Sequence, residues 1–177
     1  NDFLESVGKP PLFNVQLVGL SKEAQVYDKL FKVTPDVLIT EAHKADLIII
    51  PAVNGEWEDV IEKNKDFYPW IVKQHKAGSE VASLCVGAFL LASTGLLKGK
   101  RCSTHWLAAS EFSTMFPDVE LVSERIITDE HGIYSSGGAN SVWNLLLYVI
   151  EKYTDRDMAI LASKYFVIDM GRNDQSP

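Results

Sequence analysis

The stretch Ser83-Leu84-Cys85-Val86-Gly87-Ala88-Phe89-Leu90-Leu91-Ala92 places a cysteine between two apolar segments of different character. The segment before it, residues 79–85, predicts a short strand, and residues 86–95 predict a helix that ends at Gly95. At such a junction the helix dipole lowers the pKa of a thiol, and free N–H groups hold an oxyanion. Gly87 permits the close backbone approach that such an elbow needs. From the residues alone, Cys85 is either a nucleophile or a small buried residue at a tight turn.

The segments around this junction alternate between strand and helix patterns. Apolar runs at 12–20 and 45–53 predict strands buried on both faces, with small strands or edge structure between them at 25–39. Helical spacing over 57–77 predicts a helix or a broken pair that stops at Gly78. Two strands around the turn 129–132 and two closing helices follow, the last with Asp155 as N-cap. This order predicts an α/β sandwich with a mainly parallel central sheet flanked by helices.

The composition narrows the functional classes. The 177 residues suit one domain, and 17 Lys+Arg against 24 Asp+Glu give a net charge of -7, which repels a nucleic-acid backbone. No apolar run is long enough to cross a bilayer, and the two cysteines offer neither a disulfide framework nor zinc-ligand spacing. We therefore expect a cytoplasmic protein without membrane contact, metal or cofactor.

His105 is the residue best placed to assist the thiol. It lies 20 positions after Cys85, at the end of a later segment. In a parallel sheet both residues can reach the same edge, where such folds bind ligands. A histidine beside Trp106 is equally compatible with a structural role. The other three histidines (His43, His75 and His131) stand among polar neighbours and are expected on the surface.

Three stretches carry a resemblance to a known family: residues 46–52 "DLIIIPA", residues 77–106 "AGSEVASLCVGAFLLASTGLLKGKRCSTHW" and residues 132–153 "GIYSSGGANSVWNLLLYVIEKY". They resemble the ThiJ/PfpI superfamily, whose fold is the flavodoxin-like, class I glutamine amidotransferase-like sandwich. The block from Cys85 to Trp106 is similar to the N-terminal domain of GlxA-like AraC-family transcriptional regulators, whose C-terminal domain carries two helix-turn-helix motifs. Isocyanide hydratases share this block.

The resemblance implies roles for individual residues. Cys85 corresponds to the elbow cysteine, and His105 to the histidine near the thiol. The ligand-binding set that it implies comprises Ala52, Val53, Val86 and Gly87. Two departures weigh against turnover: Val86 lacks the side-chain donor of enzymatic relatives, and the acidic partner of the cysteine comes from an N-terminal region that we expect to lie outside this chain. Asn144 also replaces a common aspartate, which we interpret as a packing difference.

We therefore expect residues 1–171 to form a non-catalytic domain of an AraC-family regulator that senses a small-molecule ligand and forms a homodimer. Residues 172–177 are expected to begin a linker to a DNA-binding domain absent from this chain, which alone would contact DNA. The alternative is a cysteine-dependent hydratase, amidase or deglycase-like enzyme in which Cys85 attacks carbon and His105 or a water relays the proton. A redox sensor that works through oxidation of Cys85 is a third interpretation.

Overall fold

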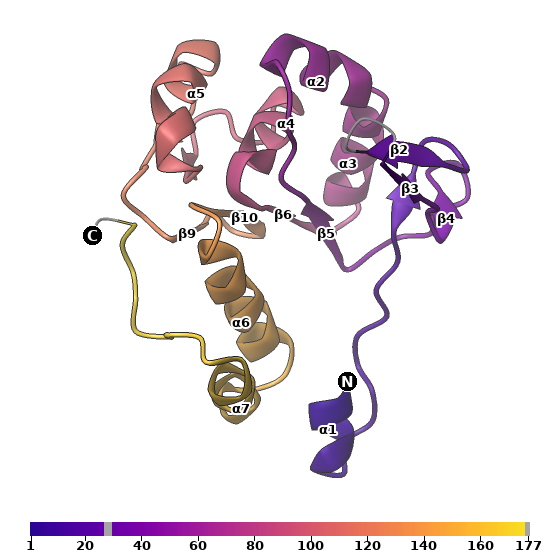
Figure 1. Ribbon diagram of the computed structural model, residues 1–177, viewed down its shortest axis with the longest axis vertical. Coiled ribbons are helices and arrows are strands. Elements are labelled where there is room, and N and C mark those ends of the chain that lie inside the picture. The colour runs from indigo at the N-terminus through magenta and orange to yellow at the C-terminus, as the bar shows by residue number, and fades with distance from the viewer. Residues whose placement is uncertain (27–29, 176–177) are drawn as a thin grey trace.

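A four-stranded sheet with the order β5-β6-β10-β9 is the centre of the computed structural model, which describes residues 1–26 and 30–175 (Figure 1). Strands β5 (Leu47–Ile50), β6 (Glu80–Ser83) and β10 (Ile133–Ser136) are parallel, and β9 (Ile127–Asp129) pairs antiparallel with β10. The expected strand pair around residues 129–132 is confirmed, and so is the mainly parallel sheet.

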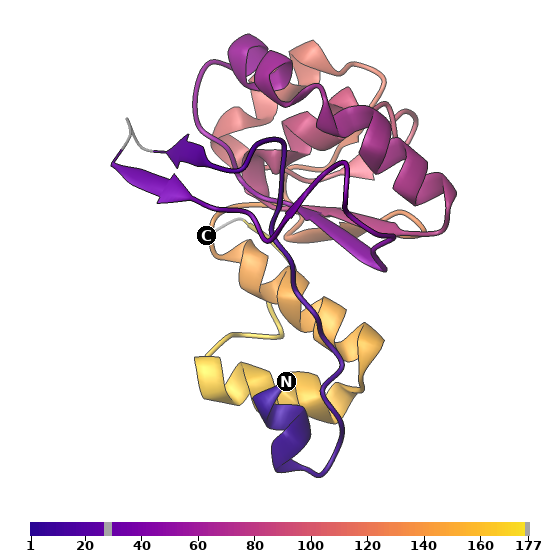
Figure 2. The ribbon, with the colours of Figure 1, turned by 90° about the vertical axis from the view of Figure 1, so that its right-hand side faces the viewer.

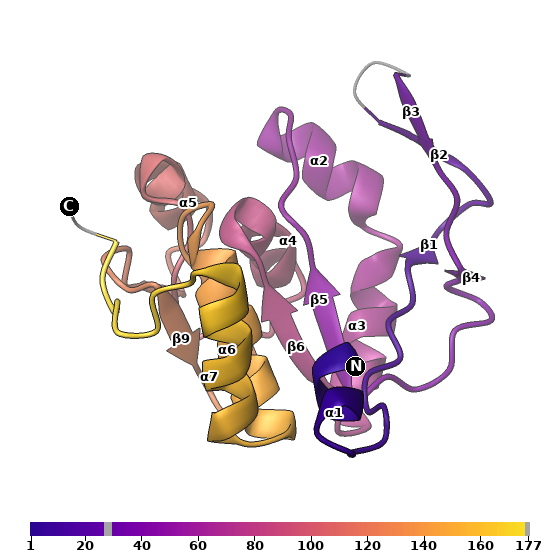
Figure 3. The same cartoon turned by 60° about the horizontal axis from the view of Figure 1, so that its bottom comes forward.

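Helices cover both faces of this sheet, so the fold has three layers (Figure 2). On one face lie α2 (Trp57–Asn64), α3 (Phe67–Lys76), α4 (Ala88–Ser93) and α5 (Ala109–Met115). On the other lie α6 (Ser141–Tyr153) and α7 (Arg156–Phe166), which pack side by side, with α1 (Asp2–Ser6) against α7 (Figure 3). The predicted α/β sandwich is confirmed. No helix in residues 1–26 and 30–175 is long and apolar enough to cross a bilayer.

The two layers bury separate apolar clusters because successive side chains of a strand point to opposite faces. In β6, Val81 joins the cluster under α2 to α5, and Ala82 joins the smaller cluster under α6. Phe89 of α4 is the centre of the larger cluster. Its ring stacks on Trp57 with centroids 3.9 Å apart and meets Phe112 edge-on at 5.1 Å. This packing fixes α4, and with it the turn that carries Cys85.

The predicted strand at residues 12–20 is wrong over most of its length. Only β1 (Val18–Gly19) is strand, paired with β4 (Val37–Leu38), and the Val15 side chain is 87% exposed. The backbone amides of Leu12 and Phe13 both donate to Asn1 Oδ1, at 3.0 Å each. The Asn1 side chain thus accepts the hydrogen bonds that a neighbouring strand would accept in a sheet. The apolar run therefore crosses the surface from α1 to β1 instead of forming a strand.

The strand predicted at residues 45–53 is present as β5, but the expectation that both of its faces are buried is wrong, because Ile48 and Ile50 are buried whereas Ile49 is 41% exposed. The other elements follow the sequence pattern. Small strands β2 (Ala24–Val26) and β3 (Phe31–Val33) form a hairpin, although the predicted residues 27–29 lie outside the described residues. Strands β7 (Arg101–Cys102) and β8 (Glu120–Leu121) pair beside the main sheet. The pattern over 57–77 is a broken helix pair, and Gly78 follows it with a φ of 94°. Asp155 caps α7 as expected, since its side chain accepts from Met158 N at 2.9 Å.

Candidate functional site

Cys85 stands on a sharp turn between β6 and α4. The short helix η1 (Cys85–Gly87) begins there and leads directly into α4. The φ of Cys85 is 54°, a left-handed value that non-glycine residues seldom adopt and that the surrounding structure must hold. A strained residue at a strand-to-helix turn is the arrangement that presents a nucleophile in other folds. The expected elbow is therefore present.

Gly87 makes this turn possible by its lack of a side chain. A Cβ at this position would lie 2.5 Å from the carbonyl oxygen of Pro51 and 2.8 Å from that of Ile50. Both oxygens belong to the backbone at the end of β5. The close approach expected of Gly87 is thus confirmed, whereas its contact with a ligand stays a prediction.

Two buried hydroxyl groups hold the peptide groups of Cys85. The Cys85 amide donates to Ser136 Oγ at 3.3 Å, and the Thr104 hydroxyl donates to the Cys85 carbonyl at 3.1 Å. Both side chains are fully buried, Ser136 at the end of β10 and Thr104 in the loop after β7. The elbow is therefore fixed from two neighbouring segments of the fold.

The surroundings of the Cys85 thiol weaken its acidity. Burial raises the pKa of the half-buried Cys85 thiol above its ordinary value, and the backbone N–H of Val86 opposes this rise only in part. The lowering expected from the helix start is therefore wrong, because desolvation of the thiolate outweighs it. Among the described residues, no carboxylate or imidazole forms a hydrogen bond with this sulfur.

His105 lies in the loop that follows β7 but does not bond to the thiol. It precedes the short helix η2 (Trp106–Ala108), and its Nδ1 accepts from the Leu107 amide at 3.2 Å. In the neutral ring this bond places the proton on Nε2, so the imidazole lacks a free acceptor. No hydrogen bond between the described residues joins His105 to Cys85. A proton relay through His105 stays a prediction.

The other implied ligand-binding residues flank the elbow. Ala52 and Val53 follow β5 in the loop whose Pro51 carbonyl faces Gly87. Ala52 is exposed, while Val53 and Val86 are half-buried against the larger cluster. Their positions at the carboxyl end of the parallel strands agree with a ligand site there. Their contacts with a ligand stay predictions.

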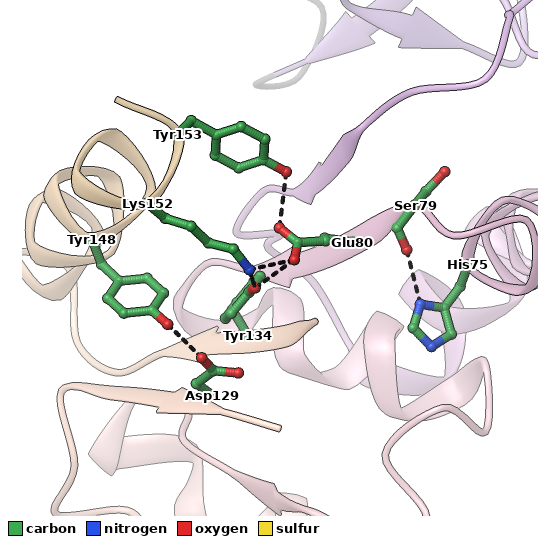
Figure 4. A network of polar contacts seen from close by, with 8 residues as sticks. All are labelled: His75, Ser79, Glu80, Asp129, Tyr134, Tyr148, Lys152 and Tyr153. Carbon is green, nitrogen blue, oxygen red and sulfur yellow. Dashed lines mark hydrogen bonds and ion pairs between the residues drawn. The ribbon is translucent and has the colours of Figure 1, made fainter. Parts of the chain in front are cut away.

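A second polar centre, which the sequence analysis did not predict, lies at the opposite end of the parallel strands, where β6 begins (Figure 4). The Glu80 carboxylate, at the start of β6, accepts hydrogen bonds from Tyr134 at 2.9 Å and Tyr153 at 2.8 Å, and pairs with Lys152. Burial opposes ionisation of Glu80, yet these bonds together lower its pKa. The network joins β6 and β10 to α6. The only available signal was an acidic residue opening an apolar strand.

An open pocket of about 440 Å³ adjoins this network. It is lined by His75, Gly78, Ser79, Glu80, Asp129, His131, Gly132, Tyr134 and Lys152. His75 Nδ1 donates to the Ser79 carbonyl at 2.9 Å, and the Tyr148 hydroxyl donates to Asp129. Within the described ranges, no group of three or more His, Cys, Asp or Glu side chains is arranged to hold a metal ion.

Comparisons with known proteins agree with the fold. The sequence model of the DJ-1/PfpI family matches residues 11–152. The chain is 26% identical over 144 residues to the HTH-type transcriptional regulator GbdR of Pseudomonas aeruginosa, covering 81% of this chain and 38% of that protein. It is 24% identical over 129 residues to the isonitrile hydratase of Pseudomonas putida, covering 72% of this chain and 54% of the hydratase.

Solved structures share the architecture. An AraC family transcriptional regulator from Pseudomonas putida superposes with a TM-score of 0.65 at 16% identity, covering 93% of this chain and 88% of that one. The chain spans less than two fifths of the length of the curated regulators that it matches first. Regulators and an enzyme therefore both stand among its relatives.

Proposed function

The chain belongs to the DJ-1/PfpI family, and we propose that it is the ligand-sensing and dimerisation domain of an AraC-type transcriptional regulator. The sequence relationship to curated HTH-type regulators supports an association with transcription regulation. In this proposal residues 1–171 are the sensing domain, and residues 172–177 lead toward a DNA-binding part outside this chain. The protein works in the cytoplasm, and DNA is contacted only through that other part.

The state of the Cys85 thiol carries the proposal. A cysteine nucleophile needs a base or a charge that stabilises its thiolate. Burial instead raises the pKa of Cys85, and the described residues offer its sulfur only the backbone N–H of Val86. Such a site is suited to hold a polar small molecule beside the elbow without transforming it.

Signalling in this proposal follows from two requirements. A ligand shifts a conformational equilibrium only by the difference between its affinities for the two states, so the pocket must differ between them. A homodimer supplies the two-fold symmetry that paired DNA half-sites demand. Ala52, Val53, Val86 and Gly87 form the proposed rim of the pocket. We expect sedimentation equilibrium to give the mass of a dimer, and a monomer at all concentrations would refute the dimerisation part.

Turnover assays separate this proposal from its rival. The purified protein and its Cys85→Ala variant are incubated with a panel of isocyanides and primary amides, and product is followed by mass spectrometry. We expect no product above the rate of the Cys85→Ala variant. Sustained product formation that this variant abolishes would replace the sensing domain with an enzyme.

The rival function, a cysteine-dependent hydratase, amidase or deglycase-like enzyme, is favoured by one specific observation. The Cys85 elbow keeps its left-handed φ and the Val86 N–H beside the sulfur, which is the frame that an oxyanion requires. In that function His105 or a water relays the proton. A His105→Gln variant that loses a measured turnover, while its unfolding midpoint stays unchanged, would support this alternative.

A further inference from the structure

The side chain of Gln175 is inserted between the two segments that hold Cys85, although it lies 90 positions further along the sequence. Its Oε1 accepts from the Gly138 amide at 2.5 Å, and its Nε2 lies 3.2 Å from the Thr104 carbonyl. The same Nε2 lies within hydrogen-bond distance of three more oxygens: Ser103 Oγ at 3.2 Å, Ser123 O at 2.6 Å and Arg125 O at 3.0 Å. Both polar atoms of the Gln175 amide therefore have hydrogen-bond partners in the fold.

The backbone on both sides of this amide is shaped to receive it. A Cβ at Gly137 would overlap the Gln175 amide, so only glycine leaves room there. Residues 173–175, here named the C-terminal strap, also bond through their backbone. Gln175 N donates to Glu124 O at 2.7 Å, and Ile126 N donates to Asn173 O at 3.3 Å. The backbones of Asp174 and Arg125 form an isolated antiparallel β-bridge. The strap is therefore anchored on the surface of the domain, directly after the proposed domain boundary at residue 171.

The two segments that Gln175 joins are those that hold Cys85. Thr104 donates its hydroxyl to the Cys85 carbonyl, and Ser136, which accepts from the Cys85 amide, lies two residues before Gly138. Cys85 has a left-handed φ, which persists only where its surroundings enforce it. The Gln175 amide thus links the two segments that hold this strained residue in place.

We propose that Gln175 is a positioning residue of the elbow, and that its amide couples the geometry of Cys85 to the C-terminal strap. Loosening the strap then loosens the elbow, and the reverse, because both are held through the segments that contain Thr104 and Gly138. The biological use of this coupling, to transmit ligand occupancy toward a DNA-binding part, rests on the proposed function. The coupling itself is tested without ligand or DNA.

The first test measures the elbow after the strap is altered. The chain is prepared with Gln175→Ala and with Gln175→Met, which keeps the side-chain length but removes the amide. Alkylation of Cys85 by iodoacetamide is timed between about pH 7 and 10. We expect Cys85 to be alkylated faster in both variants and its pH profile to shift to lower pH, because a loosened elbow exposes the thiol to water. If the pKa of Cys85 falls by about half a unit, the alkylation rate at a pH below the pKa rises about threefold.

Asn173→Ala is the matched control, because its side chain donates, among the described residues, only to the Gly171 carbonyl, two residues before it in the chain, and its backbone bond to Ile126 remains. We expect its alkylation profile to match the wild type. A purely structural role for Gln175 would lower the unfolding midpoint and leave the native-state profile of Cys85 unmoved. That result would overturn the proposal.

The second test runs in the opposite direction. Trypsin cleavage after Arg172 reports release of the strap, and it is timed before and after Cys85 is alkylated with iodoacetamide. Iodoacetamide-treated Cys85→Ala is the control for alkylation elsewhere. We expect faster cleavage only when Cys85 carries the adduct, and equal rates would refute the coupling. Neither test involves turnover or ligand, so the coupling and the proposed sensing function fail separately.

Discussion

Replacing Gly87 with alanine tests whether the elbow depends on the contact between α4 and β5. Gly87 has φ -58° and ψ -15°, so its backbone is already in the helical region and alanine fits that conformation. The obstacle is space alone. The added Cβ would lie 2.5 Å from Pro51 O and 2.8 Å from Ile50 O, below any normal separation.

The magnitude follows from two opposing effects. Alanine in a compatible conformation restricts the unfolded chain and stabilises a protein by about 0.4 to 1 kcal/mol. Forcing an extra carbon into a filled site costs about 1 to 3 kcal/mol, and backbone atoms at the end of β5 cannot rotate away as a side chain would. The steric effect prevails, and we expect a net loss of about 2 kcal/mol. For a chain of this size that lowers the unfolding midpoint by about 4 to 8 °C.

Differential scanning calorimetry and urea unfolding measure this loss. Gly171→Ala is the control, since its Cβ would meet only the exposed Asp169 carboxylate, at 3.3 Å. We expect that variant to stay within about 0.5 kcal/mol of the wild type. If Gly87→Ala is as stable as the wild type, or if both variants lose the same amount, the close contact is not what fixes the elbow.

Three further outcomes are expected. The pKa of Glu80 in the folded state lies below the ordinary 4.5, so its carboxylate stabilises the fold above that pH and loses this effect as the pH falls. Glu80→Gln weakens the bond to Lys152 and should cost about 1 to 3 kcal/mol at pH 7. In urea unfolding at a series of pH values, the stability of this variant should fall less steeply toward acid pH than that of the wild type. Asp155→Ala removes the cap of α7 and should lower the urea-unfolding midpoint, whereas Asp155→Asn keeps the acceptor for Met158 N and should lower it less. Equal losses in the two variants would exclude the cap as the cause. Burial raises the pKa of Cys102 to about 12, so peptide mapping after native alkylation near pH 8 should find the label on Cys85, and labelled Cys102 would contradict its burial.

The local pattern predicted the elbow because its requirements are local. A run of apolar residues before Cys85, a glycine two positions after it and an apolar helix pattern are all visible in one short stretch. The same pattern misplaced a strand at residues 12–20, since an apolar run does not reveal whether a neighbouring strand is available. There the Asn1 side chain accepts hydrogen bonds from the backbone amides of Leu12 and Phe13.

The state of the site depended on contacts that no sequence spacing encodes. The sequence indicated a helix start that lowers the pKa of Cys85, and only the depth of burial shows that desolvation prevails. The orientation of His105 was equally hidden, because a bond from the Leu107 amide commits its Nδ1. The network at Glu80 unites residues 54 to 73 positions apart, which only the paired strands and α6 bring together.

By itself, the sequence determined the α/β class, the parallel strands and the place of the cysteine, because secondary structure and its order follow from periodicity and turn residues over short distances. Only the tertiary structure decided how acidic the thiol is, which side chains hold the elbow and where the strap is anchored. These properties arise from burial and from contacts between distant segments. Gln175 shows the difference: a polar residue near the end of the sequence, it becomes part of the Cys85 surroundings only when the chain folds back over its own sheet.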